Sequence, residues 1–384
     1  MEIEVMGEVK PGFDLVRDEF ARLWDDIEVG ASFCVFHRGE KVVDIWGGYA
    51  DREMSREWQE GTLVNVFSTT KGLVALAIAI LFEEGKIDYE AKVVSYWPEF
   101  GAQGKHTITV AQLLSHQAGL CGVQSLLTVE DLYDWKKMVN LLASQPPLWT
   151  PGSCAGYHSV TWGFLVGELV RRLSGKTLVQ YFSEKIAEPL GADFYIGLPE
   201  SEFHRCATLI GPNHARKKPA PASNSDKSET PELNRIAMQN PIIAPFKHAC
   251  SKRWRLAEIA ASNGHANARG IATIYGALAM GGTLGDTTII SAKTIGAATK
   301  IEVDEEIDLV LGRQVRRGRG FIINTNSDYG PNPNAFGHNG TGGSTGFADP
   351  ETGIGIGYAM NQMKSEYPAT PRSRRLIDAV YECI

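Results

Sequence analysis

The sequence lacks the features of a membrane or exported protein. Its longest apolar run, GLVALAIAILF, is far shorter than a bilayer span. Its first residues, MEIEVMGEVKPGF, have neither the basic start nor the apolar core of a signal peptide. These absences predict a cytoplasmic protein.

Excess positive charge is missing as well. The chain has 38 Lys and Arg against 45 Asp and Glu, which gives a net charge of −7 without a basic stripe. This balance argues against nucleic acid or an anionic membrane surface as a partner. One basic cluster is local, and we interpret it as a solvated turn; its members are Arg313, Arg316, Arg317 and Arg319.

Paired cysteines are absent too. The six cysteines are scattered and none forms a Cys-x-x-Cys pair, so we predict no structural zinc site. We also expect no other metal and no cofactor. Buried free thiols are the default interpretation for such residues. They are Cys34, Cys121, Cys154, Cys206, Cys250 and Cys383.

What is present is an ordinary globular composition. The 384 residues are 43% hydrophobic and 22% charged, enough to bury a sizeable core. Helical patterns dominate the middle of the chain, and strand patterns occur near both ends. The expected helices are Phe13 to Ile27, the run after Ser68, Val110 to Ser115, Val129 to Leu142, Ser159 to Leu173, Leu178 to Ala187 and a last one from Arg372. The expected strands are Ser32 to Phe36, Lys41 to Tyr49, Val310 to Ile323, Gly343 to Ala348 and Gly355 to Asn361.

This order predicts a mixed α/β fold in which both chain ends build one antiparallel sheet. The expected domains are a discontinuous sheet domain of residues 1–85 and 261–384 and a mostly helical domain of residues 86–260. Within the helical domain, residues 211–232 are rich in proline and polar side chains and are expected to form a mobile loop. A flap over the pocket is the functional alternative, with residues 241–246 and Trp254 lining the cleft.

The motif Ser68-Thr69-Thr70-Lys71 stands at the head of the longest apolar run. If Ser68 opens a helix, Lys71 lies one turn away on the same face and can accept the serine proton. Burial and the positive helix terminus both favour the neutral amine, and the Ser68 N–H is free to face an oxyanion. A helix-capping serine followed by a surface lysine fits the same motif, so partners elsewhere must decide.

A second element is Tyr157-His158-Ser159, which follows a Pro-Gly turn and precedes an amphipathic helix. A tyrosine at such a junction can point into a cleft, and a phenol beside a lysine can relay protons. Tyr181-Phe182-Ser183 has the same pattern but lies within a helical stretch, where Tyr181 is expected to be a packed residue.

A third element is His338-Asn339-Gly340, which precedes a glycine-rich hairpin. Glycines from Gly340 to Gly343 allow the backbone to approach a ligand closely. The N–H of Thr341 is the candidate second oxyanion donor. His37-Arg38-Gly39 matches the pattern as well, but it is expected to be the turn of an N-terminal hairpin.

Residues 342–346 form a competing motif, Gly-x-Ser-x-Gly, which in α/β-hydrolases carries the nucleophile. That fold needs a helix directly after the serine and a histidine further along the chain. Here a strand pattern follows Ser344, and none of the nine histidines comes after it. Ser344 is therefore interpreted as structural.

Taken in order, Ser-x-x-Lys, Tyr-x-Ser and His-x-Gly resemble the serine β-lactamase and penicillin-binding-protein superfamily. Within it the chain most resembles class C β-lactamase-like proteins and family VIII carboxylesterases. Residues 107–120 and 261–282 resemble further segments of that family, and the resemblance runs from about residue 10 to the end.

The resemblance implies a role for each matching position. Ser68 corresponds to the acylated nucleophile, Lys71 to its base and Tyr157 to the tyrosine that shuttles protons. The N–H groups of Ser68 and Thr341 correspond to the oxyanion hole. His338 stands where true lactamases of the superfamily carry the lysine of a Lys-Thr-Gly triplet.

Two departures from the family pattern bear on the substrate. A histidine at position 338 is mostly neutral near pH 7, so it holds a substrate carboxylate less well than a lysine. Ser159 replaces an asparagine whose amide suits a substrate amide. Both changes favour a small neutral ester, so a carboxylesterase with little lactamase activity is expected, with Gly340 and Trp149 also lining the substrate site.

Other functions remain open at this point. A β-lactamase or D-amino-acid peptidase, an acyltransferase of the same fold and a non-catalytic scaffold are the alternatives. The expected partner is a small-molecule ester, and the sequence leaves the natural substrate, the oligomeric state and the choice between Lys71 and Tyr157 as base undetermined.

Overall fold

The computed structural model describes residues 3–25, 28–211, 232–304, 306–364 and 371–384. The helices are α1 (Asp14–Ala21), α2 (Thr69–Glu83), α3 (Val110–Leu114), α4 (Trp135–Ser144), α5 (Thr161–Ser174), α6 (Leu178–Phe182), α7 (Glu188–Leu190), α8 (Glu232–Gln239), α9 (Pro245–His248), α10 (Lys252–Leu256), α11 (Ala268–Ala279), α12 (Ala292–Ala298) and α13 (Pro371–Glu382). The strands are β1 (Met6–Val9), β2 (Gly30–His37), β3 (Glu40–Gly48), β4 (Val64–Asn65), β5 (Phe194–Ile196), β6 (Gly264–Ala266), β7 (Thr283–Leu284), β8 (Thr287–Thr288), β9 (Ile322–Ile323), β10 (Phe336–Asn339), β11 (Thr345–Asp349) and β12 (Ile354–Met360).

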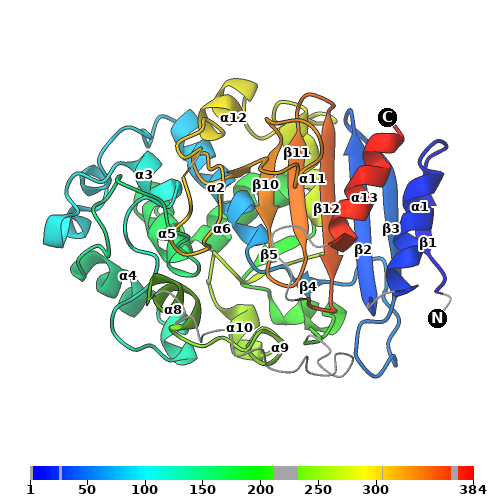
Figure 1. The fold of residues 1–384 in the computed structure, drawn as a ribbon, viewed down its shortest axis with the longest axis horizontal. Coiled ribbons are helices and arrows are strands. Elements are labelled where there is room, and N and C mark those ends of the chain that lie inside the picture. Colours follow the sequence, from blue (N-terminus) through cyan, green and yellow to red (C-terminus); the bar gives the residue numbers. More distant parts are fainter. Residues whose placement is uncertain (1–2, 26–27, 212–231, 305, 365–370) are drawn as a thin grey trace, which may run out of the picture.

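The central sheet joins the two ends of the chain, as predicted. Its seven strands follow the order β1-β3-β2-β12-β11-β10-β9, and every neighbouring pair is antiparallel. The N-terminal β2 and the C-terminal β12 pair directly, from Ala31 opposite Met360 to His37 opposite Ile354. Figure 1 shows this sheet on one side of the molecule and the helices α3 to α6 on the other. The mixed α/β fold is confirmed, whereas the residue limits of the two domains remain a prediction.

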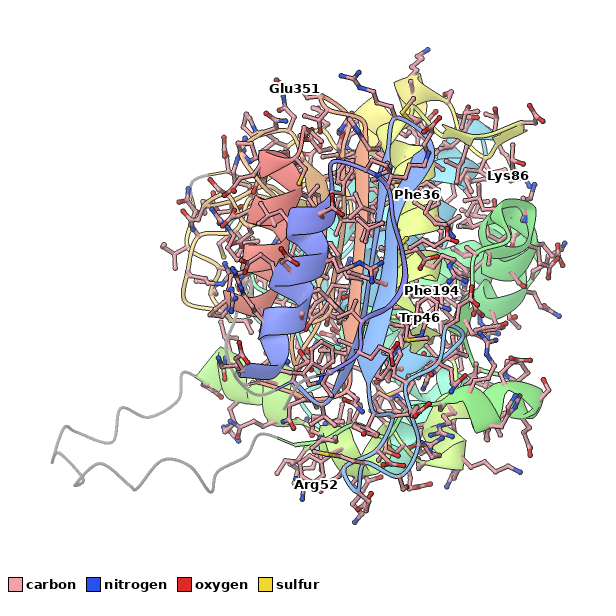
Figure 2. The ribbon with its side chains drawn as sticks, turned by 90° about the vertical axis from the view of Figure 1, so that its right-hand side faces the viewer. Phe36, Trp46, Arg52, Lys86, Phe194 and Glu351 are labelled. Atoms are coloured by element: carbon pink, nitrogen blue, oxygen red, sulfur yellow. The ribbon has the colours of Figure 1, made fainter. Side chains whose placement is uncertain are left out.

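The two faces of the sheet are covered differently. Helix α11 packs on β2, β11 and β12, and glycines on that face permit the close approach: a Cβ added at Gly355 would lie 2.2 Å from the backbone of Gly276. Helices α1 and α13 pack together beside the sheet (Figures 1 and 2). There Arg372 of α13 forms a buried ion pair with Glu28, and the Tyr358 hydroxyl of β12 donates to the same carboxylate.

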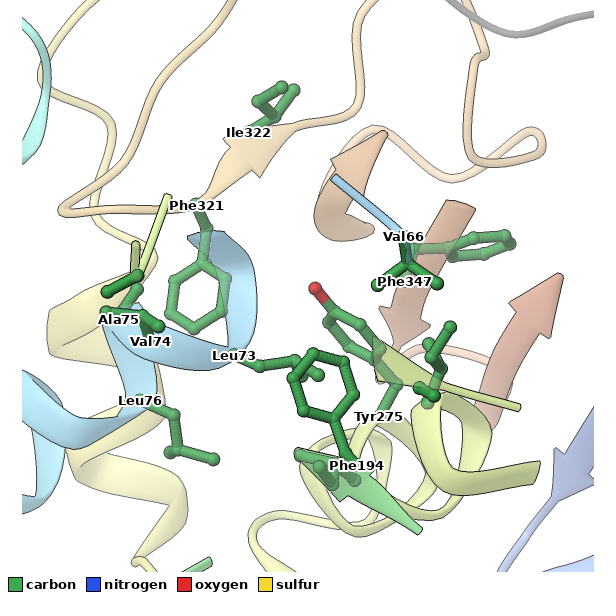
Figure 3. Close-up of a cluster of buried hydrophobic side chains, with 14 of the residues drawn as sticks. Val66, Leu73, Val74, Ala75, Leu76, Phe194, Tyr275, Phe321, Ile322 and Phe347 are labelled. Atoms are coloured by element: carbon green, nitrogen blue, oxygen red, sulfur yellow. The ribbon is translucent and has the colours of Figure 1, made fainter. Parts of the chain in front are cut away.

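Helix α2 is the centre of the core. Every residue from Thr69 to Leu81 is buried, which explains why the apolar run has no polar face. Figure 3 shows Leu73 and Val74 of this helix among Tyr275, Phe321 and other apolar side chains. Gly85, with φ of 70°, follows the C-terminus of α2, as expected for a helix stop.

Several expected elements differ in detail. Val129 to Leu142 is a 3₁₀ turn (Val129–Tyr133) followed by α4, and the segment after α6 is a π-helical turn (Ser183–Ala187). Further 3₁₀ turns are Arg22–Asp25, Val93–Ser95, Pro98–Gly104 and Glu200–Arg205. The predicted hairpins at β2–β3 and β11–β12 are confirmed, and Tyr181 is a packed helix residue as expected.

One predicted strand is mostly wrong. Of the expected strand from Val310 to Ile323, only Ile322–Ile323 joins the sheet. Gly312 and Gly320 have positive φ angles of 66° and 106°, which bend the chain out of an extended path. The expected loop at 211–232 lies outside the described residues except at its two ends. No helix in the described part of the chain is long and apolar enough to cross a membrane.

Candidate active site

Ser68 lies at the junction of a short strand and the buried helix α2. Strand β4 ends at Asn65, and Phe67 then adopts a φ of 43°, which is uncommon for a residue with a side chain. Ser68 occupies the N-cap position of α2, yet its side chain makes no capping hydrogen bond. The alternative of a capping serine is therefore wrong, and the hydroxyl is available to other partners.

Lys71 is completely buried and contacts that hydroxyl. Its Nζ lies 3.0 Å from Ser68 Oγ and donates to the Ala261 carbonyl at 2.9 Å. No carboxylate pairs with this amine among the residues that the structure describes. Burial lowers the pKa of Lys71 well below its usual value, and the nearby Arg317 lowers it further. The alternative of a surface lysine is therefore wrong, and a neutral amine beside Ser68 can accept a proton.

Tyr157 reaches the same serine from the helical side of the molecule. Its hydroxyl donates to Ser68 Oγ at 2.7 Å, and Lys71 Nζ lies 4.8 Å from the centre of its ring. The residue stands between the Pro-Gly turn and α5, as the sequence indicated. Residues of two separate motifs, Lys71 and Tyr157, thus meet at the hydroxyl oxygen of Ser68.

Three buried histidines surround the tyrosine. The rings of His116 and His338 lie 5.2 and 6.2 Å from that of Tyr157. His158 is fixed by two backbone contacts: its Nε2 accepts from Leu120 N–H, and its Nδ1 lies 2.6 Å from the Gly156 carbonyl. Burial lowers the pKa of His116 and His338 well below the usual range and that of His158 to about 4. All three rings are therefore neutral near pH 7.

His116 was not identified from its sequence. Its φ is 68°, and its Nδ1 accepts the backbone N–H of His158 at 2.9 Å, which holds the chain just after Tyr157. Its sequence signal is its position within residues 107–120, a segment that resembles the family but contains no catalytic motif.

His338 lies in strand β10 opposite Gly346 of β11. Its Nδ1 is 2.8 Å from the Asn339 carbonyl, whereas its buried Nε2 has no hydrogen-bond partner among the described residues. Besides burial, the neighbouring Lys71 lowers its pKa. This position therefore carries no permanent cation.

The glycine-rich turn after β10 is attached to the chain around Ser68. Gly340 N–H donates to the Ser344 carbonyl at 2.8 Å, and Gly343 N–H donates to the Gly340 carbonyl at 3.1 Å. Ser344 Oγ in turn donates to the Val66 carbonyl at 2.8 Å. A Cβ at Gly340 would lie only 2.2 Å from that carbonyl oxygen, so this close contact requires glycine.

Two backbone N–H groups, those of Ser68 and Thr341, are candidate donors to a ligand. Neither the N–H of Ser68 nor that of Thr341 donates a hydrogen bond among the described residues. Thr341 is exposed and Ser68 is 8% exposed, so a ligand can reach this place. Two such donors fit the requirement of an oxyanion hole.

The remaining predicted binding residues lie close to Tyr157. Trp149 is half-buried, donates from Nε1 to the Cys154 carbonyl at 3.1 Å, and packs with Tyr157 in a small apolar cluster. Ser159 is half-buried two residues after Tyr157, and its hydroxyl makes no hydrogen bond within the described chain. Trp254, expected in one alternative to line the cleft, is instead fully buried in the main core.

The basic cluster also differs from its prediction as a solvated turn. Arg317 and Arg319 are only 2% and 6% exposed. Arg317 forms an ion pair with Asp308 at 2.5 Å, and its guanidinium lies 5.4 Å from the Tyr157 ring centre. No sequence signal indicated this pair, because Asp308 belongs to an irregular segment without a motif.

The described residues contain no group of three metal-ligating side chains close enough to hold an ion. All six cysteines are free; three are buried and Cys154, Cys250 and Cys383 are partly exposed.

Comparison with known proteins covers nearly the whole chain. A family model described as Beta-lactamase matches residues 16–380. A protein named Esterase/beta-lactamase LipL, from Mycobacterium tuberculosis, is 35% identical over 379 residues, which are 94% of this chain and 84% of that protein. Among solved structures, a family VIII carboxylesterase has a TM-score of 0.93 and 48% identity, covering 99% of this chain and 100% of its own. A penicillin-binding protein homologue from Caulobacter crescentus has a TM-score of 0.89 and 40% identity, with coverage of 99% and 100%.

Proposed function

The chain belongs to the β-lactamase family and is a serine hydrolase of that fold; we propose that it cleaves small carboxylic esters through an acyl-enzyme on Ser68. The observation that carries this proposal is the double contact of one serine oxygen with the amine of Lys71 and the phenol of Tyr157. A serine needs such a proton acceptor to become nucleophilic.

In the proposed reaction Ser68 Oγ attacks the ester carbonyl carbon. The proton of Ser68 moves through Lys71 and Tyr157, and the Tyr157 hydroxyl delivers a proton to the leaving alkoxide. The N–H groups of Ser68 and Thr341 bind the negative oxygen of the tetrahedral intermediate. Water then attacks the acyl-enzyme, and the same groups move the protons in the opposite direction.

The preference for esters follows from the charges around the site. The neutral His338 cannot attract a substrate carboxylate as a lysine would. Arg317 does not replace it, because its guanidinium is buried and tied to Asp308. The short Ser159 offers one hydroxyl where an amide would offer both a donor and an acceptor. A neutral ester needs only the nucleophile and the oxyanion donors.

Hydrolysis of p-nitrophenyl acetate and butyrate by the wild type and by Ser68→Ala tests the proposal. We expect ester cleavage by the wild type, a loss of at least about 10³-fold in kcat/KM for Ser68→Ala, and slow or no cleavage of the lactam nitrocefin. A fluorophosphonate probe should add its mass to the peptide that contains Ser68.

Ser344→Ala is the matched serine control and should keep most of the activity. Ester turnover that persists in Ser68→Ala would overturn the assignment of the nucleophile. Nitrocefin cleavage as fast as ester cleavage would overturn the argument from His338 and Ser159, and would favour the lactamase alternative.

A further inference from the structure

A buried ion pair lies beside the tyrosine of the proposed site. The side chains of Asp308 and Arg317 are each only 2% exposed, and Arg317 Nη2 lies 2.5 Å from Asp308 Oδ2. Because removing two charges from water is costly, a buried pair of this kind contributes little net stability compared with apolar side chains of similar size. Its position therefore suggests another purpose.

Asp308 holds the backbone of the tyrosine in place. Its Oδ1 accepts the N–H of Tyr157 at 3.1 Å and those of Val310 and Leu311 at 2.9 Å each. Burial raises the pKa of the carboxyl group, but Arg317 and the N–H donors outweigh that effect and the pKa is lowered. Asp308 is thus ionised and fixes the Tyr157 peptide relative to the segment 308–311.

Arg317 brings a permanent positive charge to the same tyrosine. Its guanidinium lies 5.4 Å from the centre of the Tyr157 ring, and Lys71 Nζ lies 4.8 Å from that centre. The negative end of the pair is neutralised by three N–H donors as well as by the arginine. The arginine, after burial, lowers the pKa of Lys71, His116 and His338, so the positive end of the pair acts on the groups around the ring.

The other ionisable groups near Lys71 do not compete with this charge. Tyr157 contacts Lys71 through its ring, and His116 and His338 stand around that ring. Burial lowers the pKa of both histidines well below the usual range, so neither carries charge near pH 7. Arg317 is the charged neighbour that opposes protonation of Lys71, and only burial has a larger effect on the pKa of that amine.

We propose that Arg317, held by Asp308, is a positioning residue that fixes Tyr157 and whose permanent charge keeps Lys71 in the proton-accepting form. This inference rests on the proposed function, because it assigns Lys71 and Tyr157 their roles at Ser68. It also gives the site a permanent cation, which the neutral His338 does not supply.

The test is the pH dependence of Ser68 labelling by a fluorophosphonate, which reports serine activation without any choice of ester. In the wild type the rate should rise with pH as Lys71 loses its proton. The part of the pH profile in which the labelling rate rises with pH is called the acid limb. In Arg317→Gln the pKa of Lys71 should rise, so the acid limb should move to higher pH. At a pH below the pKa of Lys71, where the rate still rises with pH, the rate should then fall about tenfold for every pH unit by which the limb moves. Arg317→Lys keeps the charge and should leave the limb in place.

Arg319→Gln is the matched control. Arg319 is nearly as buried, pairs with Glu302 and Glu90, and lies over the ring of Tyr89 instead of Tyr157. It should not move the limb. A rate that falls equally at every pH in Arg317→Gln, or an equal displacement of the limb in Arg319→Gln, would show that Arg317 acts only through the fold and would overturn the inference.

A single Arg317 variant leaves a buried carboxylate without its partner and can lose stability. The double variant Asp308→Asn/Arg317→Gln removes both charges, and its limb should move in the same direction as that of Arg317→Gln. If the wild type itself is not labelled at Ser68, the proposed function fails. If the wild type is labelled and the limb of a folded double variant coincides with that of the wild type, only the present inference fails.

Discussion

Two serines, Ser68 and Ser344, stand in motifs that occur at hydrolase nucleophiles, and both adjoin Thr69: Ser68 precedes it in the chain and Ser344 contacts its hydroxyl. Ser68 Oγ contacts an amine and a phenol. Ser344 Oγ contacts the Val66 carbonyl and, at 3.0 Å, the Thr69 hydroxyl. The first serine has partners that can take its proton, whereas the second contacts no such group among the described residues. Reactivity is therefore set by the groups around the hydroxyl and not by the local motif.

The elements that follow each serine explain this difference. Ser68 precedes helix α2, so its side chain faces the residue one turn later, which is Lys71. Ser344 precedes strand β11 and is buried at 2% exposure, so its side chain bonds across to the chain before α2. The Ser344 hydroxyl donates its proton to the Val66 carbonyl, so in its contact with Thr69 it accepts and the Thr69 hydroxyl donates. Ser344 thus joins the glycine-rich turn to the segment that carries Ser68.

The largest effect is expected from replacing Lys71, the proton acceptor that Ser68 contacts and Ser344 does not. Lys71→Met keeps a similar volume but has no proton acceptor, so kcat/KM for p-nitrophenyl butyrate should fall by about 10²- to 10⁴-fold. The same change should stabilise the fold. An apolar side chain suits a fully buried position better than an amine held there against its preference for water.

The stabilisation should depend on pH in a defined direction. The pKa of Lys71 is lowered in the folded state, whereas the unfolded chain has the ordinary value of 10.5. Between these two pKa values the unfolded state binds a proton that the folded state does not, so this group adds stability as the pH rises. The advantage of Lys71→Met should therefore be largest near neutral pH and shrink toward pH 10. Thermal unfolding at pH 7 and pH 9.5 measures it, and a destabilised variant at pH 7 would contradict the argument.

A smaller effect is expected from a change at Gly340, which lies close both to Ser344 and to the chain just before Ser68. Gly340→Ala would place a Cβ 2.2 Å from both Val66 O and Ser344 Oγ, so the turn that carries Thr341 must move. Loss of one oxyanion donor lowers kcat by about 10²- to 10³-fold, and we expect the lower end of this range with little change in KM.

The matched control for this prediction is Gly296→Ala. Gly296 lies in helix α12, and an added Cβ meets no atom within 4 Å. It should leave kcat unchanged and stabilise the helix slightly. A Gly340→Ala variant with wild-type kcat would show that the turn tolerates displacement and that Thr341 is not the donor we propose.

How well the sequence predicted each contact depends on how far apart along the chain its residues lie. Ser68 and Lys71 are one helical turn apart, so local periodicity was enough to place them together. Tyr157 comes from a distant segment, and only the order of three motifs connected it to Ser68. The β11–β12 hairpin was predictable because it is local, with a turn signal between two strand patterns.

The errors concern residues whose position depends on distant partners. Charge alone suggested that Arg317 is solvated, but Asp308 and the Tyr157 ring bury it. A strand was expected from 310 to 323, but positive φ angles at Gly312 and Gly320 interrupt it. His116 has no motif of its own, because its role depends on a backbone N–H that lies 42 residues away.

The smallest effect is expected from Ser344 itself. Ser344→Ala removes a donor from the buried Val66 carbonyl, so the free energy of unfolding should fall by about 1–3 kcal/mol, while kcat/KM should stay within about threefold of the wild type. Thr69→Val removes only the hydrogen bond between the two hydroxyls. Because the two residues are in contact, the double variant should cost less than the sum of the single changes. Chemical denaturation and ester kinetics on all four proteins measure both quantities. A loss of activity in Ser344→Ala as large as that in Ser68→Ala would remove the distinction between the two serines, and with it the assignment of Ser68 as the one that attacks.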